Sequence, residues 1–82
     1  MTNKTNNTLD INNFGENLRR IRIEKGFTIE EFAFEIDKSS RLIYDYENGF
    51  KFPKLETLII IATVLEVTLD SILRSAWDVI FL

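Results

Sequence analysis

Two short helical segments that follow each other within about twenty residues constrain this sequence more than any other feature. The first begins at Thr28, because a threonine followed three residues later by Glu31 forms a capping box for the free N–H groups of a helix start. The second begins at Ser39, another residue type preferred at helix N-termini, and ends before Gly49, placed as a C′ glycine. Only the turn at residues 37–38 separates them. The sequence therefore predicts two short consecutive helices joined by a tight turn.

Three more helices are predicted from apolar periodicity and from capping residues. The first covers about 13–25 and is stopped by Gly26, the fourth covers about 55–66, and the fifth begins after Thr68. Helical spacing gives each an inward face. On the first, second and fourth helices the residues predicted to face inward are Phe14, Leu18, Ile21, Arg22, Ile29, Phe32, Ala33, Ile36, Leu55, Leu58, Ala62 and Leu65.

The expected architecture is a small all-α domain, a five-helix arrangement with an extended C-terminal helix. Neither a sheet signal nor an internal repeat is present. We expect a disordered polar tail at 1–11, the helical domain at 12–74 and a C-terminal extension at 75–82. The last four residues, 79–82, continue the helical period but also suit a short strand, because Val, Ile and Phe favour strands.

Several functions are disfavoured by the residue types alone. The 82-residue chain contains neither cysteine nor histidine, so thiol nucleophiles, the usual zinc sites and His-based acid–base catalysis are ruled out. Its carboxylates lie mostly at capping or exposed positions, and we expect no enzyme, no cofactor and no metal. Neither a signal peptide nor an apolar run long enough to span a bilayer is present, so a cytoplasmic protein is expected.

The charge is unevenly distributed along the chain. The net charge is −3, yet residues 1–54 hold nine basic and nine acidic side chains, whereas residues 55–82 hold one basic and four acidic ones. A surface for a polyanion must therefore be local and must lie in the first part of the chain.

The predicted third helix has one face rich in hydrogen-bonding groups. With Ile43 at the centre of the buried side, a rotation of about 100° per residue leaves the opposite side to Arg41, Tyr44, Asp45 and Asn48. Such side chains can meet base edges, for example arginine at guanine and asparagine at adenine. An ordinary solvated helix face explains the same four residues equally well.

The order of these signals resembles the helix-turn-helix domains of the lambda-repressor-like (XRE, Cro-type) family. The resemblance extends over about 60 residues and combines the capping box, an alanine within the second helix, a short turn and a Glu-Asn-Gly sequence. The matching residues are Gly15, Leu18, Arg22, Gly26, Thr28, Ile29, Glu30, Glu31, Phe32, Ala33, Ser39, Ile43, Glu47, Asn48, Gly49, Pro53, Leu58, Ala62, Leu65, Val67 and Leu69.

The resemblance implies a dimeric protein that binds duplex DNA and regulates transcription. In that case the residues that read base edges are Ser40, Arg41, Tyr44 and Asp45. Phosphates are expected at Asn48, at the helix starts marked by Thr28 and Ser39, and at nearby lysines. These lysines are Lys38, Lys51 and Lys54.

Two residues depart from the family pattern. Ile29 stands where glutamine usually helps to hold a phosphate, and Asp45 stands where a basic or neutral polar residue is more common. Asp45 lies four residues after Arg41, so the two can pair along the helix. The carboxylate either orients the guanidinium for guanine or quenches it, and the weakness of an exposed pair favours orientation.

A further ion pair is predicted inside the domain. Arg22 lies on the inward face of the first helix and Glu47 lies near Ile43 on the third. A partly buried charge needs a partner, and the resemblance implies the same pairing, so we expect a structural role for both.

The apolar residues near the C-terminus exceed what one small core needs. Either a homodimer forms there, with two reading helices about 34 Å apart on a palindromic site, or the fifth helix simply folds over the core. The alternative function is a protein-interaction module, such as an antitoxin-like adaptor, with weak DNA binding. The expected dimer residues are Ile60, Val64, Trp77, Ile80, Phe81 and Leu82.

Overall fold

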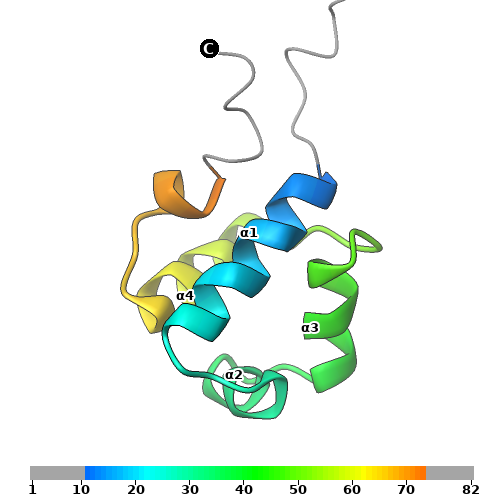
Figure 1. The fold of residues 1–82 in the computed structure, drawn as a ribbon, viewed down its shortest axis with the longest axis vertical. Helices are drawn as coiled ribbons and strands as arrows, with labels where there is room; N and C mark the ends of the chain where they lie inside the picture. Colours follow the sequence, from blue (N-terminus) through cyan, green and yellow to red (C-terminus); the bar gives the residue numbers. More distant parts are fainter. Residues whose placement is uncertain (1–10, 74–82) are drawn as a thin grey trace, which may run out of the picture.

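The computed structural model describes residues 11–73, which form four α-helices and the beginning of a fifth, with no strand (Figure 1). The helices are α1 (Ile11–Glu24), α2 (Ile29–Glu35), α3 (Ser40–Glu47) and α4 (Leu55–Leu65), followed by a helical segment at 69–73. The all-α expectation is confirmed. The predicted tail, the extension at 75–82 and the choice between helix and strand at 79–82 lie largely outside the described residues.

Local capping determines where α2 and α3 begin. The Thr28 hydroxyl accepts a hydrogen bond from the Glu31 N–H at 3.0 Å, and the Glu31 carboxylate accepts one from the Thr28 N–H at 2.9 Å. The Ser39 hydroxyl accepts from the Leu42 N–H at 3.1 Å. Between them the chain reverses through Asp37, a non-glycine residue with φ of 58°. The predicted pair of capped helices and the tight turn are confirmed.

The core lies where the inward faces of the helices meet. Its largest fully buried side chains are Phe14, Leu18, Phe32, Ile43, Ile61, Leu65 and Ile72. On α4 one expectation is wrong, because Leu55 is 65% exposed whereas Ile61 is completely buried. Leu55 is the first residue of the helix, and the buried positions begin one turn later, at Thr57 and Leu58.

Helices α1 and α3 pack closely enough that a side chain would not fit between them at one point. A Cβ atom built on Gly15 of α1 would lie 2.5 Å from the carbonyl oxygen of Glu47 and 2.6 Å from that of Tyr46. These distances are below van der Waals contact and the obstacle is backbone. Glycine at position 15 therefore sets the spacing between α1 and the C-terminal end of α3.

A buried asparagine joins α1 to the segment that follows α4. The Asn17 side chain donates from Nδ2 to the carbonyl oxygens of Ser71, at 2.9 Å, and Ile72, at 2.5 Å. Its Oδ1 accepts from the Arg20 guanidinium. Because Asn17 is only 4% exposed, these bonds satisfy a polar group that would otherwise be costly to bury. They fix the start of the fifth helix against α1.

A second polar contact links α3 to α4. The buried Tyr46 hydroxyl forms a hydrogen bond with Thr57. Burial raises the pKa of Tyr46 above its ordinary value, and the bond to Thr57 opposes that shift.

Candidate nucleic-acid interface

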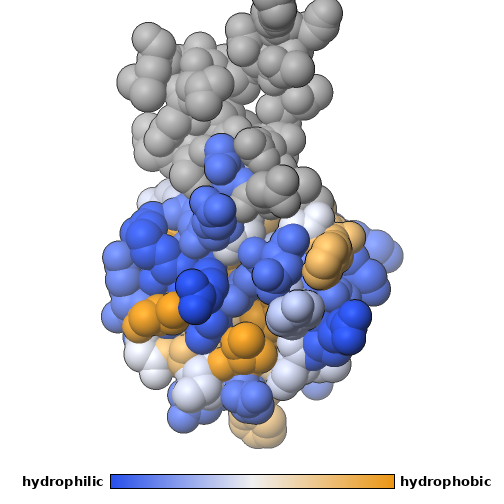
Figure 2. All heavy atoms as spheres, turned by 45° about the vertical axis from the view of Figure 1, so that its right-hand side comes forward, coloured by the Kyte–Doolittle hydropathy of each residue, from blue (hydrophilic) through white to orange (hydrophobic). Residues whose placement is uncertain are grey.

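The outer side of α3 carries the polar residues that the sequence assigned to it, with one exception. Arg41 and Tyr44 are exposed, with 79% of the Arg41 side chain and 44% of Tyr44 accessible. Ser40 is half-buried at the start of the helix, and Asn48 is exposed just after its end. Figure 2 brings this side of the molecule forward and shows a mainly hydrophilic surface in which apolar groups stand apart from one another.

Asp45 is the exception, because the expectation that it faces solvent is wrong. The residue is only 7% exposed. After Gly49, which has φ of 81°, the chain folds back, and the N–H groups of Phe50 and Lys51 donate to the Asp45 carbonyl oxygen at 2.9 and 3.3 Å. This returning loop therefore lies against the last turn of α3 at Asp45.

The Asp45 carboxylate joins two exposed cations. Its Oδ1 accepts from Arg41 Nε at 3.1 Å, and its Oδ2 lies 3.9 Å from Lys51 Nζ. Both cations remain accessible, with 79% of the Arg41 and 61% of the Lys51 side chain exposed. The carboxylate is thus better placed to position the two cations than to meet a base itself.

Two aromatic rings continue the exposed side of α3. The ring centroids of Tyr44 and Phe50 are 6.3 Å apart, and the Arg41 guanidinium carbon lies 5.6 Å from the Tyr44 centroid. Phe50 is 69% exposed although it is apolar. Cations and aromatic faces attract each other at such distances, so Arg41 is held by Asp45 on one side and by Tyr44 on the other.

The three lysines expected near phosphates gather around one shallow hollow. Lys38 comes from the turn before α3, and Lys51 and Lys54 come from the loop after it. Leu42 and Phe52 form part of the same hollow. Residues distant in sequence thus concentrate positive charge beside α3, although the chain as a whole is acidic.

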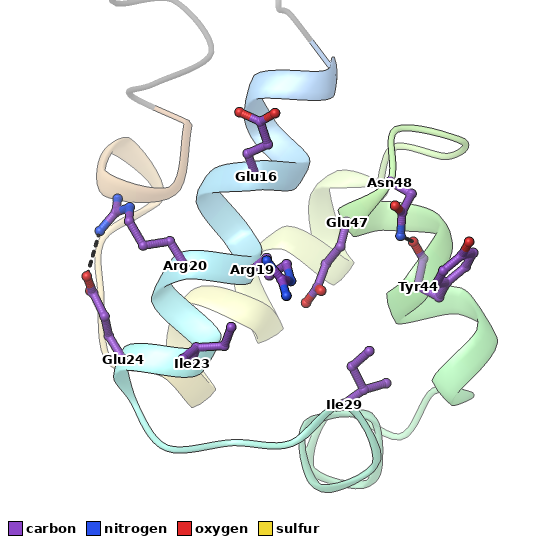
Figure 3. A pocket seen from close by; sticks show the side chains of 9 residues that line it. All are labelled: Glu16, Arg19, Arg20, Ile23, Glu24, Ile29, Tyr44, Glu47 and Asn48. Carbon is purple, nitrogen blue, oxygen red and sulfur yellow. Dashed lines mark hydrogen bonds and ion pairs between the residues drawn. The ribbon is translucent and has the colours of Figure 1, made fainter.

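A groove of about 920 Å³ lies between α1, the start of α2 and α3 (Figure 3). Arg19 extends from α1 into this groove, and Ile29 points into it from α2. Asn48 lines its α3 side, where its Nδ2 donates to the Tyr44 carbonyl oxygen at 2.9 Å. The hydroxyls of Thr28 and Ser39 accept hydrogen bonds as caps and keep their own O–H protons, so each can still donate to a phosphate beside the backbone N–H groups of these helix starts.

The predicted partners Arg22 and Glu47 lie together between α1 and α3. Arg22 donates from Nε to Glu47 Oε2 at 2.6 Å and from Nη2 to Oε1 at 3.1 Å. Its Nη1 donates to the Phe27 carbonyl oxygen at 2.7 Å. The two side chains are 6% and 3% exposed, so this bidentate pair is part of the interior and leaves neither group accessible to a ligand.

Three residues were missed by the sequence reasoning. Asn17 is buried by residues 71–72, Arg19 faces the groove, and Phe50 packs beside Tyr44. Arg19 has a sequence signal, since Arg19, Arg20 and Arg22 place three arginines within four residues of the first helix. Phe50 also has a sequence signal. It is an aromatic residue directly after the Glu-Asn-Gly helix end, and it belongs to none of the apolar faces predicted for the core.

The surface expected to form a dimer is only partly described. Ile60 is 42% exposed and its neighbour Ile59 is 48% exposed, whereas Val64 is partly buried against the core. The remaining expected dimer residues lie outside residues 11–73. They are Trp77, Ile80, Phe81 and Leu82. Within the described residues, no helix has the length and apolarity needed to cross a membrane.

Comparison with solved structures gives the same arrangement of helices. The restriction-modification controller protein C.AhdI from Aeromonas hydrophila is 27% identical, with a TM-score of 0.74 over 77% of this chain and 96% of that chain. The clp gene regulator ClgR from Corynebacterium glutamicum is 26% identical, with a TM-score of 0.77 over 85% of this chain and 74% of that chain.

A third similar structure is the master regulator for biofilm formation SinR in complex with DNA. It is 23% identical, with a TM-score of 0.69 over 73% of this chain and 97% of that chain, and this likeness concerns the fold. No curated protein sequence matches the chain.

These features define a small all-α domain whose second and third helices are joined by a tight turn, with one side of α3 exposed to solvent. The family model described as helix-turn-helix matches residues 18–72. The chain therefore belongs to the helix-turn-helix family, and the resemblance to lambda-repressor-like domains is confirmed.

Proposed function

We propose that this protein binds duplex DNA sequence-specifically as a homodimer and regulates transcription, acting as a repressor. The observation that carries the proposal is the outer side of α3, where an exposed arginine is held between a buried carboxylate and an aromatic ring. An arginine fixed in this way loses less conformational freedom when it forms bidentate contacts with guanine. Membership of the helix-turn-helix family supports the proposal, and so does the DNA complex of the similarly folded SinR.

The proposed contacts divide into base-reading and phosphate contacts. Arg41, Tyr44 and Ser40 meet base edges, while Asp45 acts by orienting Arg41 and Lys51. The hollow formed by the three lysines supplies the phosphate contacts on one side of α3. On the other side Ile29 has no group that binds phosphate, and Arg19 places positive charge in a groove that Glu16 and Glu24 also line. These contacts provide affinity without sequence information.

The proposed homodimer uses the outer side of α4 together with the C-terminal residues. Ile59 and Ile60 give this side an exposed apolar surface, which is commonly covered by another subunit. A twofold axis there would set two copies of α3 about one helical turn of DNA apart, and the preferred site would be a palindrome.

A protein-interaction role is the second candidate. The net charge of −3 opposes non-specific attraction to DNA, and Phe34 on α2 is 83% exposed. An exposed phenylalanine of this kind suits a protein partner better than a phosphate backbone.

Selection from a pool of random duplexes over a salt series tests the proposal. We expect enrichment of a palindrome and a steep loss of affinity with salt. Arg41→Ala should lose about 1–3 kcal/mol of discrimination at one base pair of each half-site. Size measurements in solution should give a dimer.

The control variant is Lys25→Ala. Lys25 is exposed near the end of α1, where it lies with Val67 and Ser71 away from α3, and its loss changes the net charge equally. It should leave the selected sequence unchanged. A folded dimer that enriches no sequence even at low salt would reject DNA reading and favour the protein-interaction role.

A further inference from the structure

Two exposed aromatic rings, those of Tyr44 and Phe50, lie beside Arg41. Contacts with phosphate or guanine do not account for an exposed apolar ring such as that of Phe50. Phe50 is 69% and Tyr44 is 44% exposed, and their ring centroids are 6.3 Å apart. A single exposed apolar side chain is common on protein surfaces. Here, however, two rings adjoin each other on the side of α3 that carries the reading residues, so their position within the interface needs a reason.

The position of Phe50 is fixed by backbone hydrogen bonds. Gly49 adopts φ of 81°, which turns the chain back, and the Phe50 N–H donates to the Asp45 carbonyl oxygen at 2.9 Å. The next residue, Lys51, donates to the same oxygen at 3.3 Å. Phe50 is thus anchored to the last turn of α3 and moves with that helix.

Two cations frame the aromatic pair. Arg41 lies 5.6 Å from the Tyr44 ring, and Lys51 follows Phe50 directly in the chain. Both cations lie close to the Asp45 carboxylate, at 3.1 and 3.9 Å. An apolar patch between two accessible positive charges suits a partner that combines negative charge with a small apolar group.

In the major groove of DNA, thymine is the only one of the four bases that offers such a group. Its C5-methyl projects into the groove and is contacted by apolar side chains, phenylalanine among them, while the flanking phosphates attract cations. We propose that Phe50, supported by Tyr44, packs against the methyl group of a thymine in each half-site, and so specifies that base. This inference rests on the proposed DNA-binding function and adds a specificity residue outside α3.

Removal of a single methyl group from the DNA tests the inference directly. In the selected duplex each thymine is replaced, one at a time, by deoxyuridine, which keeps base pairing and lacks only the methyl. We expect one position per half-site at which the wild-type protein loses about fourfold in affinity, as expected for one buried methyl-sized group. With Phe50→Ala the same replacement should have no further effect.

Two further variants serve as controls. Phe34→Ala removes another exposed phenylalanine, 83% accessible on α2, and should keep the full sensitivity to deoxyuridine. Phe50→Leu retains an apolar side chain and should keep part of it, and circular dichroism will show whether each variant is folded.

The possible results separate the inference from the function on which it rests. If the protein selects a sequence but no thymine shows sensitivity, or if Phe50→Ala remains as sensitive as the wild type, the methyl contact is refuted while DNA binding stands. If no sequence is selected, DNA binding fails, and the methyl contact fails with it.

Discussion

Two arginine–carboxylate pairs, each including a residue of α3, lie in opposite surroundings. In the first, Arg22 and Glu47 make two contacts, at 2.6 and 3.1 Å, with side chains 6% and 3% exposed. In the second, Arg41 and Asp45 make one contact at 3.1 Å, and 79% of the arginine side chain is exposed. The chemical groups are almost the same, but the first pair is bidentate and buried on both sides, whereas in the second only the carboxylate is buried, with 10% of the Asp45 side chain exposed.

The fold requires the buried Arg22–Glu47 contact, whereas the exposed Arg41 can exchange its contact with Asp45 for another. Both charges of the buried pair have lost their hydration, so each needs the other, and loss of one partner leaves an isolated charge in the interior. In the outer pair only Asp45 is buried, and Arg41, with 79% of its side chain exposed, stays hydrated whether or not it contacts the carboxylate. A negatively charged ligand can therefore replace Asp45 as the partner of Arg41 with little loss of free energy. Arg22 has no such freedom, because its contacts with Glu47 are part of the folded interior.

Removal of the buried carboxylate should have the largest effect on stability. We expect Glu47→Ala to lower the free energy of unfolding by about 3–5 kcal/mol, because Arg22 is left without its partner. For a domain of this size each kcal/mol lowers the melting temperature by about 4–8 °C, so the melting temperature should fall by roughly 12–40 °C. Urea and thermal denaturation followed by circular dichroism measure the change.

The matched control is Glu24→Ala. Glu24 pairs with Arg20 at 3.1 Å, but both side chains are more than half exposed. This variant should lose about 0.5 kcal/mol or less. Equal melting temperatures for the two variants would contradict the distinction between the buried and the exposed pair.

Gly15→Ala tests the same contact between α1 and the end of α3 without any change of charge. The added Cβ would lie 2.5 Å from the Glu47 carbonyl oxygen, so α1 and α3 must move apart at the buried pair. We expect a loss of about 1–3 kcal/mol in the free energy of unfolding, as for other overpacked positions. An unchanged stability would show that the spacing of the two helices adjusts freely.

The elements that the sequence predicts well depend on nearby residues. The caps at Thr28 and Ser39 are formed within three residues, and the ends of α1 and α3 follow from Gly26 and Gly49, with φ of 88° and 81°. The Arg22–Glu47 pairing joins residues 25 positions apart, and it was predicted because both lie on inward faces and because the family resemblance implies it. What stays a prediction is the binding role of each candidate reading residue.

The features that the sequence does not predict depend on the position of a residue within the folded chain, including contacts with distant segments. A helical wheel leaves Asp45 in solvent, because the wheel does not include the loop after Gly49 that returns to Asp45. Asn17 is polar on a helix, and its burial depends on carbonyl oxygens at 71–72, more than fifty residues later. Leu55 has the right spacing for the core but lies at the first position of α4. In each case the helix period is correct and the neighbouring element is missing from the reasoning.

The outer pair can be tested by a change of charge that preserves its shape. In Asp45→Asn the amide oxygen still accepts from Arg41, but the negative charge that holds Arg41 and Lys51 is lost. The stability should change by about 0.5–1.5 kcal/mol, the range of one hydrogen bond, because Arg41 and Lys51 stay solvated without the carboxylate. We expect affinity for non-specific DNA to rise, because a negative charge has been removed, and affinity for the selected duplex to fall, because Arg41 is less well oriented. The ratio of the two affinities, measured at one salt concentration, gives the result.

Glu24→Gln is the control for charge in this experiment. It removes one carboxylate charge from an arginine partner at the same 3.1 Å distance, on α1 instead of α3. Both variants should bind non-specific DNA more tightly, but only Asp45→Asn should reduce the ratio of specific to non-specific affinity. If the ratio rises instead, Asp45 quenches Arg41 in the wild-type protein. The Arg41–Asp45 pair would then weaken DNA binding. Like the Arg22–Glu47 pair, it would occupy its arginine, and the two pairs would differ only in how strongly they do so.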